Sequence, residues 1–246
     1  MDKTKPFFAI LLGDSLSLPR HKSSISIEDT YFYRIGKWWQ ERYGQTVFWP
    51  LSKGGATISH LTSNFYSFLP YLGPKRIDVA IVQLGVVDCA PRPLPYRVRT
   101  WLTRVPKNIR SRIVRLLHRN RRKLLKAGMS FRFTNPKKFR IIYSDLLKRL
   151  SVESSRVYVT NIAPATEITY QHSYGLKESI VNYNKIIDEV ASTILGVKVI
   201  DIYNELQESS KVGAAEDIHM SKEGHDIIFH KVCEYEEQIW QEQQIK

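Results

Sequence analysis

The chain has 246 residues, of which 43% are hydrophobic and 11% aromatic. This length and composition favour a single globular domain over 1–246 and exclude an intrinsically disordered chain. With only two cysteines, the sequence excludes a disulfide framework and the paired-cysteine spacing of zinc sites. The net charge of +13 points to an anionic partner.

The first predicted element is a strand at 7–12, where six apolar residues indicate burial on both faces, as in a parallel sheet. The strand leads directly into Gly13-Asp14-Ser15-Leu16. Open α/β folds bind ligands at the carboxyl ends of their strands, so the Ser15 hydroxyl is expected at a ligand-binding edge. An ordinary turn in which Asp14 or Ser15 caps a helix accounts for the tetrapeptide equally well.

Further strands alternate with helices along the chain. We expect strands at 46–50, 77–84, 156–161 and 197–202, and helices at 26–43, 57–71, 137–150, 178–195 and 221–241. This alternation predicts an α/β fold. Its expected form is a three-layer α/β/α sandwich around a parallel, five-stranded, flavodoxin-like sheet.

Two loops between these elements carry candidate functional groups. Gly54-Gly55 follows the second strand, and paired glycines allow a backbone N–H to approach a ligand closely, although an ordinary turn is the simpler interpretation. Glu216-Asp217-Ile218-His219 precedes the last helix. An acid two or three residues before a histidine can hold one imidazole nitrogen while the other faces a serine. Such a histidine is more often part of an exposed salt bridge.

A basic segment at 89–136 interrupts the alternation after the third strand, and we interpret it as a helical insertion. Between Cys89 and Ser144 there are 17 Lys and Arg residues and no acid, whereas the other 20 Lys and Arg residues face 24 acids. Three prolines exclude regular structure at the start of the segment. Residues 108–126 have the apolar spacing of one amphipathic basic helix.

Three interpretations of the basic segment compete. It is a solvated helix face, or a nucleic-acid surface on which Trp101, Phe131 and Phe133 stack bases, or a surface for anionic membrane or glycan. We favour the last, through 97–140, because each basic residue near anionic lipid contributes about 1 kcal/mol. The sequence contains no recognised nucleic-acid motif. The insertion is then expected to overhang Ser15 as a lid.

The location of the protein is predicted from its first apolar run. This run is too short to span a membrane and lacks a small-residue cleavage site. We therefore expect a cytoplasmic protein, peripheral on the inner face of the membrane.

Taken together, the motifs resemble those of the SGNH (GDSL) hydrolase family. Gly13-Asp14-Ser15-Leu16 matches its first block, Gly54-Gly55-Ala56-Thr57 its second, and Glu216-Asp217-Ile218-His219 its last. The resemblance implies that Ser15 is the nucleophile, His219 the base, and Gly55 a backbone donor to the oxyanion. Glu216 or Asp217 would orient His219, and the family spacing favours Glu216. No metal or cofactor is implied.

The third block departs from the family pattern Gly-x-Asn-Asp, because the chain has Gly85-Val86-Val87-Asp88. Valine has no side-chain N–H to replace that of the asparagine. The oxyanion would then be bound by the N–H groups of Ser15 and Gly55 alone, or Arg92 would donate in place of the asparagine. Asp88 is expected to have a structural role or to bind a substrate hydroxyl. Arg20, just past the nucleophile, is a candidate to bind an anionic substrate.

These expectations describe a serine esterase that removes an acyl group, most simply O-acetyl, from a carbohydrate or lipid-linked saccharide through an acyl-enzyme. One alternative is an O-acyltransferase acting on a surface-polysaccharide intermediate. Another is a catalytically decayed binding protein that uses the basic segment on an anionic partner.

Overall fold

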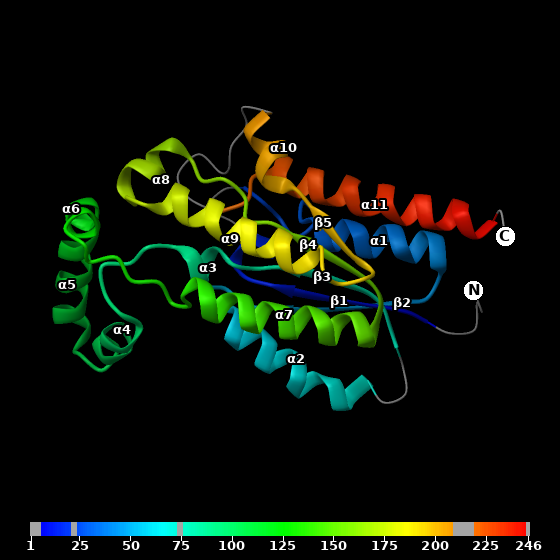
Figure 1. Cartoon of the computed structure of the whole chain (residues 1–246), viewed down its shortest axis with the longest axis horizontal. Coiled ribbons are helices and arrows are strands. Elements are labelled where there is room, and N and C mark those ends of the chain that lie inside the picture. The colour runs from blue at the N-terminus through cyan, green and yellow to red at the C-terminus, as the bar shows by residue number, and fades with distance from the viewer. Residues whose placement is uncertain (1–5, 21–23, 73–75, 209–218, 245–246) are drawn as a thin grey trace.

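The protein is described by a computed structural model, which covers residues 6–20, 24–72, 76–208 and 219–244. Within these residues, five strands pair in parallel in the order β2-β1-β3-β4-β5 (Figure 1). They are β1 (Phe7–Gly13), β2 (Thr46–Ser52), β3 (Ile77–Gln83), β4 (Ser154–Thr160) and β5 (Val197–Ile200). This is the flavodoxin-like order, and the predicted fold class is confirmed.

Helices cover both faces of the sheet, which gives the three predicted layers (Figure 1). On one face, α1 (Tyr31–Tyr43) packs against α11 (Lys222–Gln244). On the other face, α7 (Pro136–Glu153) packs between α2 (Ile58–Leu72) and α9 (Leu176–Ala191). Right-handed crossovers between parallel strands require this distribution.

The core is centred on β1 and β3, which are buried along almost their whole length. Large aromatic side chains from the surrounding helices, such as Trp39, Phe65 and Tyr143, are fully buried against them. The edge strand β2 is instead only partly covered. Burial on both faces explains why apolar residues follow one another without interruption at 7–12 in β1 and 79–82 in β3.

The first helix begins later than its sequence predicts. Helix α1 begins at Tyr31 and not at residue 26, because the preceding residues form a turn. The N–H and hydroxyl groups of Ser26 both donate to the Asp29 carboxylate, at 3.0 and 2.8 Å. Side-chain hydrogen bonds of this kind compete with the helical backbone pattern.

The single helix predicted at 108–126 is wrong. The structure has two helices there, α5 (Lys107–Arg119) and α6 (Arg121–Lys126), which meet at Asn120. Asn120 has φ −102° and ψ 9°, outside the helical region, and its side chain donates to the Leu116 carbonyl oxygen at 3.0 Å. Asparagine thus ends α5 although the apolar spacing continues.

Several short helices carry no strong periodicity and were not predicted. They are the 3₁₀ helix η1 (Ser15–Ser17), α3 (Val86–Cys89), α4 (Tyr96–Leu102), α8 (Glu167–His172) and α10 (Ile202–Glu208). Helices η1 and α3 directly follow β1 and β3. They shape the carboxyl edge of the sheet.

The basic insertion, with helices α4, α5 and α6, projects beyond the carboxyl ends of the strands (Figure 1). Arg92 and Phe131 join its two ends through a pair of antiparallel backbone hydrogen bonds of 2.8 and 2.9 Å. Arg121 donates to Ser173 Oγ at 3.0 Å, and Arg132 donates to Ser179 Oγ at 2.8 Å. These contacts dock the insertion on the segment around α8 and on α9. None of the helices in the described ranges is both long and apolar enough to cross a membrane.

Candidate active site

Three loops meet at the carboxyl edge because they leave neighbouring strands at residues that are in register. Gly13 at the end of β1 lies opposite Ser52 of β2 and Gln83 of β3. The N–H of Lys53 also donates to the Gly13 carbonyl oxygen at 3.0 Å. The first, second and third sequence blocks are therefore brought together at one edge.

The first block forms the tight turn that carries Ser15. Asp14 caps η1, since its Oδ1 accepts the Leu16 N–H at 2.9 Å, and the hydroxyl of Ser17 donates to the Asp14 carbonyl oxygen at 3.0 Å. Ser15 itself is partly exposed. Its hydroxyl makes no hydrogen bond within the described residues. The capping interpretation thus applies to Asp14 and leaves Ser15 accessible.

Gly55 lies in a turn closed by a 3.1 Å hydrogen bond from the Ala56 N–H to the Lys53 carbonyl oxygen. Its φ of +71° favours glycine at this position. No partner in the described part of the chain accepts a hydrogen bond from the Gly55 N–H. That N–H is therefore available to a ligand.

The third block is held by the body of the protein. The Asp88 carboxylate is buried and accepts the Ile58 N–H at 2.9 Å and the Thr134 hydroxyl. This geometry supports the structural alternative for Asp88. Val87, where the family has asparagine, is buried as well, and Arg92 Nη2 donates to the Val87 carbonyl oxygen at 3.4 Å. Arg92 thus holds the backbone of this block.

The last block is only partly described. Glu216 and Asp217 lie outside the described residues, and His219 is half-buried just before α11. His225, in the first turn of α11, is packed in the core: it is 1% exposed, and its Nδ1 accepts the Tyr31 N–H at 3.3 Å. Burial lowers the pKa of His225 to about 4, so the ring stays neutral.

Tyr31 links the start of α11 to the carboxyl edge of the sheet. Its hydroxyl donates to Gln83 Oε1 at 2.8 Å, at the end of β3. A salt bridge of 2.8 Å between Lys222 and Asp29 fixes the same junction. Arg20 lies beside it in an antiparallel bridge with Ile25. These contacts anchor the helix that follows His219 at the edge that carries Ser15.

Two buried carboxyl groups lie beneath this edge. Burial raises the pKa of Asp14 to about 7, with a further contribution from Asp88 and an opposing one from the Leu16 N–H. Burial also raises the pKa of Asp88 to about 6, although the Thr134 and Ile58 hydrogen bonds favour its ionised form. Asp14 is therefore largely protonated below neutral pH.

We expect the free energy of unfolding of the native chain to fall as the pH rises from 5 to 8, and that of Asp14→Asn to fall less. Folded Asp14 keeps a proton that the unfolded chain releases near pH 4, so the free energy of unfolding falls between about pH 4 and pH 7. The slope for one such group is about 1.4 kcal/mol per pH unit. Urea unfolding at pH 5 and pH 8 measures it. A difference between the two proteins that does not change with pH would contradict the shift.

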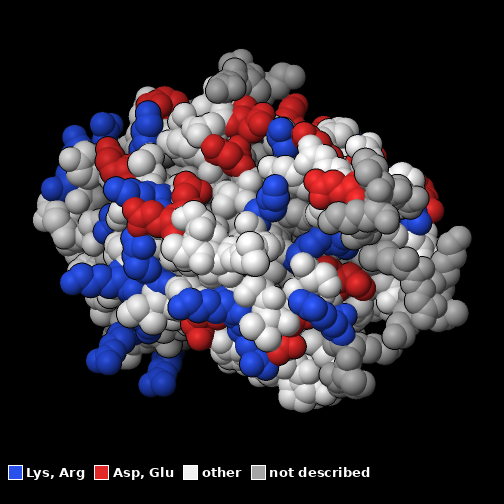
Figure 2. Space-filling model, turned by 45° about the vertical axis from the view of Figure 1, so that its right-hand side comes forward, with Lys and Arg blue, Asp and Glu red and all other residues white. Residues whose placement is uncertain are grey.

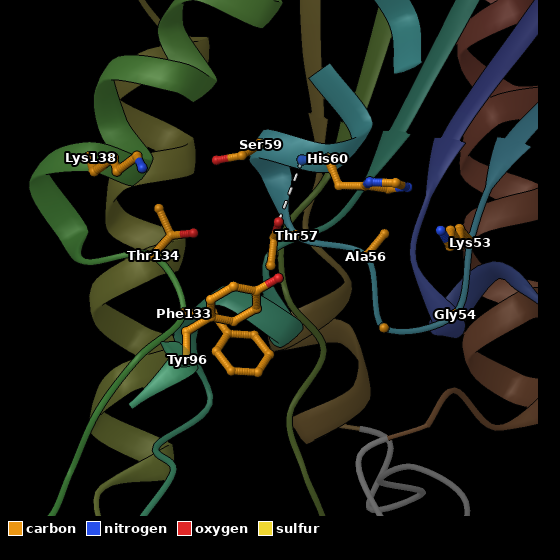
Figure 3. A pocket seen from close by; sticks show the side chains of 11 residues that line it. Lys53, Gly54, Ala56, Thr57, Ser59, His60, Tyr96, Phe133, Thr134 and Lys138 are labelled. Atoms are coloured by element: carbon orange, nitrogen blue, oxygen red, sulfur yellow. Dashed lines mark hydrogen bonds between the residues drawn. The ribbon is translucent and has the colours of Figure 1, made fainter. Parts of the chain in front are cut away.

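A pocket of about 500 Å³ lies between the second block and the base of the insertion (Figure 3). Its lining consists of Lys53, Gly54, Gly55, Ala56, Thr57, Ser59, His60, Tyr96, Phe133, Thr134 and Lys138. The Gly55 turn forms one wall of this pocket. Ser15 is not among the lining residues. It follows β1, whereas the Gly55 turn follows the neighbouring strand β2.

No sequence motif predicts the wall formed by Tyr96, Phe133, Thr134 and Lys138. The one local signal is the helix start at Asn135-Pro136, where Asn135 Oδ1 accepts the Lys138 N–H at 2.9 Å. It indicates that the residues just before α7 return to the edge of the sheet. Among the described residues, no group of three His, Cys, Asp or Glu side chains is arranged to hold a metal ion.

Comparisons with known proteins bear on the family and the fold of the chain. The model of the GDSL-like lipase/acylhydrolase family matches residues 11–227. No curated protein sequence matches the chain significantly.

Solved structures share the fold. A lipase/acylhydrolase from Enterococcus faecalis is 13% identical, with a TM-score of 0.59 over 92% of this chain and 94% of that chain. A lipolytic G-D-S-L family member from Veillonella parvula is 13% identical, with a TM-score of 0.58 over 92% and 96%. An acetylxylan esterase from Geobacillus stearothermophilus is 11% identical, with a TM-score of 0.59 over 91% and 90%.

The family match covers most of the chain and includes the Ser15 turn, the Gly55 turn and His219. The chain belongs to the GDSL-like lipase/acylhydrolase family and is a carboxylic ester hydrolase.

Proposed function

We propose that the protein removes an acyl group, most simply acetyl, from a carbohydrate by a serine acyl-enzyme route. The observation that carries this proposal is the register of β1 and β2. It sets the Ser15 turn beside the Gly55 turn, whose N–H is unoccupied within the described residues. A nucleophile and an oxyanion donor on one strand edge are the parts that acyl transfer requires.

In the proposed mechanism, His219 accepts the proton of the Ser15 hydroxyl as its oxygen attacks the ester carbonyl carbon. The N–H groups of Ser15 and Gly55 stabilise the tetrahedral oxyanion. His219 then gives its proton to the leaving sugar oxygen, which leaves an acyl group on Ser15. Water attacks that acyl group as His219 accepts its proton. His219 then returns the proton to Ser15 Oγ as the bond to the acyl group breaks, which releases the acid and restores the Ser15 hydroxyl. Glu216 or Asp217 would orient the imidazole.

A carbohydrate substrate is supported by two features. The pocket beside Gly55 combines the aromatic rings of Tyr96 and Phe133 with the hydroxyl groups of Thr57 and Ser59. Aromatic walls and a few placed polar groups suit an amphipathic sugar ring. One structural neighbour, moreover, is named as an acetylxylan esterase.

An alkyl fluorophosphonate probe tests the nucleophile directly. We expect covalent labelling of the native chain at Ser15, because an activated serine displaces fluoride from phosphorus. Mass spectrometry of the labelled peptide locates the adduct. Ser15→Ala is expected to remain unlabelled, and Ser111→Ala, in the exposed part of α5, to be labelled normally. Labelling at another serine, or none, would refute the proposed site.

The basic insertion is proposed to bring the enzyme to an anionic membrane surface that displays a lipid-linked substrate. Helix α5 has no buried residue, and its apolar side chains Ile109 and Leu116 are 53% and 63% exposed. Trp101 on α4 is 59% exposed. Figure 2 shows basic side chains projecting from the end of the molecule that carries the insertion. Basic charge beside exposed apolar groups is the composition of an interfacial helix.

Co-sedimentation with vesicles measures this contact. We expect binding to vesicles of 30% phosphatidylserine and little binding to pure phosphatidylcholine. Because about 1 kcal/mol is contributed per basic residue near the surface, Arg112→Gln with Arg115→Gln should weaken binding about tenfold or more. Lys148→Gln with Lys185→Gln, on α7 and α9, keeps the same net charge and serves as the control. Equal, negligible binding to both vesicles would remove the membrane contact from the proposal.

A further inference from the structure

We propose that the pocket between the Gly55 turn and the base of the insertion is a subsite for a negatively charged sugar residue, one that carries a carboxylate or phosphate group. The inference deepens the proposed function and rests on it, because the acylated residue of the same saccharide would lie at Ser15. No acidic residue lines the pocket.

Two lysines supply the charge from opposite walls. Lys53 belongs to the second block and Lys138 to the first turn of α7, and they stand on opposite sides of the pocket in Figure 3. Within the described ranges, neither ammonium group forms a salt bridge. Their charges are therefore uncompensated, and an anion between the two walls would interact with both.

Two arginines that contact the Phe133 ring add to the positive charge near the pocket. The guanidinium of Arg92 lies 4.1 Å from the centroid of the Phe133 ring, and that of Arg99 lies 5.4 Å from it. Burial, together with the nearby charges of Arg99 and Arg121, lowers the pKa of Arg92 to about 10. These like charges repel one another, and the buried Asp88 carboxylate offsets only part of the repulsion at Arg92. A bound anion would relieve this repulsion.

The remaining lining suits a sugar ring. Tyr96 and Phe133 meet edge to face, with their ring centroids 5.3 Å apart, and Tyr96 is 59% exposed. The apolar face of a pyranose can pack on this aromatic wall. Ser59 presents an exposed hydroxyl to the same space. Thr57 Oγ1 accepts the His60 N–H at 3.4 Å, so its own hydroxyl proton remains available to a ligand.

The position of the pocket makes it part of the substrate path. Lys53 opens the turn that holds Gly55, and the Lys53 N–H is bonded to Gly13, two residues before Ser15. A saccharide whose acyl group lies at the Ser15 and Gly55 N–H groups would extend its neighbouring residue toward Lys53. The charged group would then be recognised one residue away from the ester.

Paired substrates test the subsite. We expect kcat/KM for O-acetylated oligogalacturonate to exceed that for O-acetylated xylooligosaccharide of the same length by tenfold or more. Lys138→Gln should reduce this ratio at least threefold, mainly through KM for the acidic substrate. Lys137→Gln is the matched control on the same helix, outside the pocket lining, and should keep the native ratio. An equal rate for both substrates in the native protein, or an unchanged ratio in Lys138→Gln, would overturn the subsite and leave the esterase intact.

Calorimetry on the Ser15→Ala variant separates binding from turnover. Oligogalacturonate should bind at least tenfold more tightly than xylooligosaccharide, and Lys138→Gln should reduce that advantage at least threefold. Glucose 6-phosphate compared with galacturonate distinguishes a phosphate from a carboxylate as the recognised group. If neither substrate is hydrolysed by the native protein while this preference persists, the subsite stands and the proposed esterase function fails. Equal affinity for all the sugars would overturn the subsite.

Discussion

Ser15→Ala and His219→Ala are each expected to reduce the hydrolysis of p-nitrophenyl acetate by about 10⁴-fold or more. The reason is that the hydroxyl and the imidazole act as one unit, since the serine oxygen is a weak nucleophile until a base accepts its proton. For the same reason the double variant should be no slower than either single variant. The initial rate of nitrophenolate release, measured for the native protein and for each variant at high protein concentration, gives the effect.

Two residues on the exposed surface of α5 provide the controls. Ser111→Ala and His118→Ala remove the same groups outside the proposed site and should leave the rate within about twofold, as surface substitutions usually do. Circular dichroism checks that all five variants, the double variant included, are folded. A native rate in either Ser15→Ala or His219→Ala would eliminate the proposed mechanism.

Glu236→Gln is expected to lower the free energy of unfolding by about 3–5 kcal/mol. Glu236, on α11, is fully buried and forms an ion pair with Arg156 of β4, with Oε1 and Nε 3.1 Å apart. The Tyr158 hydroxyl donates to the same oxygen at 2.6 Å. Loss of the carboxylate charge leaves the mostly buried Arg156 guanidinium without its counter-ion. Urea denaturation followed by tryptophan fluorescence gives the free energy.

Its neighbour on the helix provides the comparison. Glu237 is half exposed and lies 3.9 Å from Arg42, so Glu237→Gln should cost about 1 kcal/mol or less. Replacing Glu236 and Arg156 together by leucine and methionine should recover most of the loss, because it removes both buried charges. Equal destabilisation by Glu236→Gln and Glu237→Gln would show that the buried pair has no special role.

The sheet could be predicted from sequence because its strands are marked locally. Burial on both faces favours apolar runs, which occupy residues 7–12 in β1 and 79–82 in β3, and these runs are visible without knowledge of the partner strands. The ends of the helices were harder to predict than the strands. The Ser26–Asp29 hydrogen bonds form a turn that keeps α1 from beginning before Tyr31, and the Asn120 side chain separates α5 from α6. Both depend on side-chain conformations that apolar spacing does not encode.

The candidate site was predictable only in part, for a similar reason. Ser15 and Gly55 stand directly after strands, so the register of the sheet brings them together. Thr134, which binds Asp88, and Tyr96, in the pocket wall, come from the insertion. Their positions depend on how the insertion folds back onto the body. No motif in the sequence records that contact.

The paired backbone hydrogen bonds between Arg92 and Phe131 also bear on how such an enzyme diversifies. The chain leaves and re-enters the domain at adjacent points, and a longer excursion between them adds little closure entropy, about 0.6 kcal/mol for each doubling of its length. Whatever lies between these two residues can be lengthened, shortened or exchanged while the sheet stays as it is. Evolution can thus change the surface that this segment presents to a partner without changing the sheet edge that carries the proposed site.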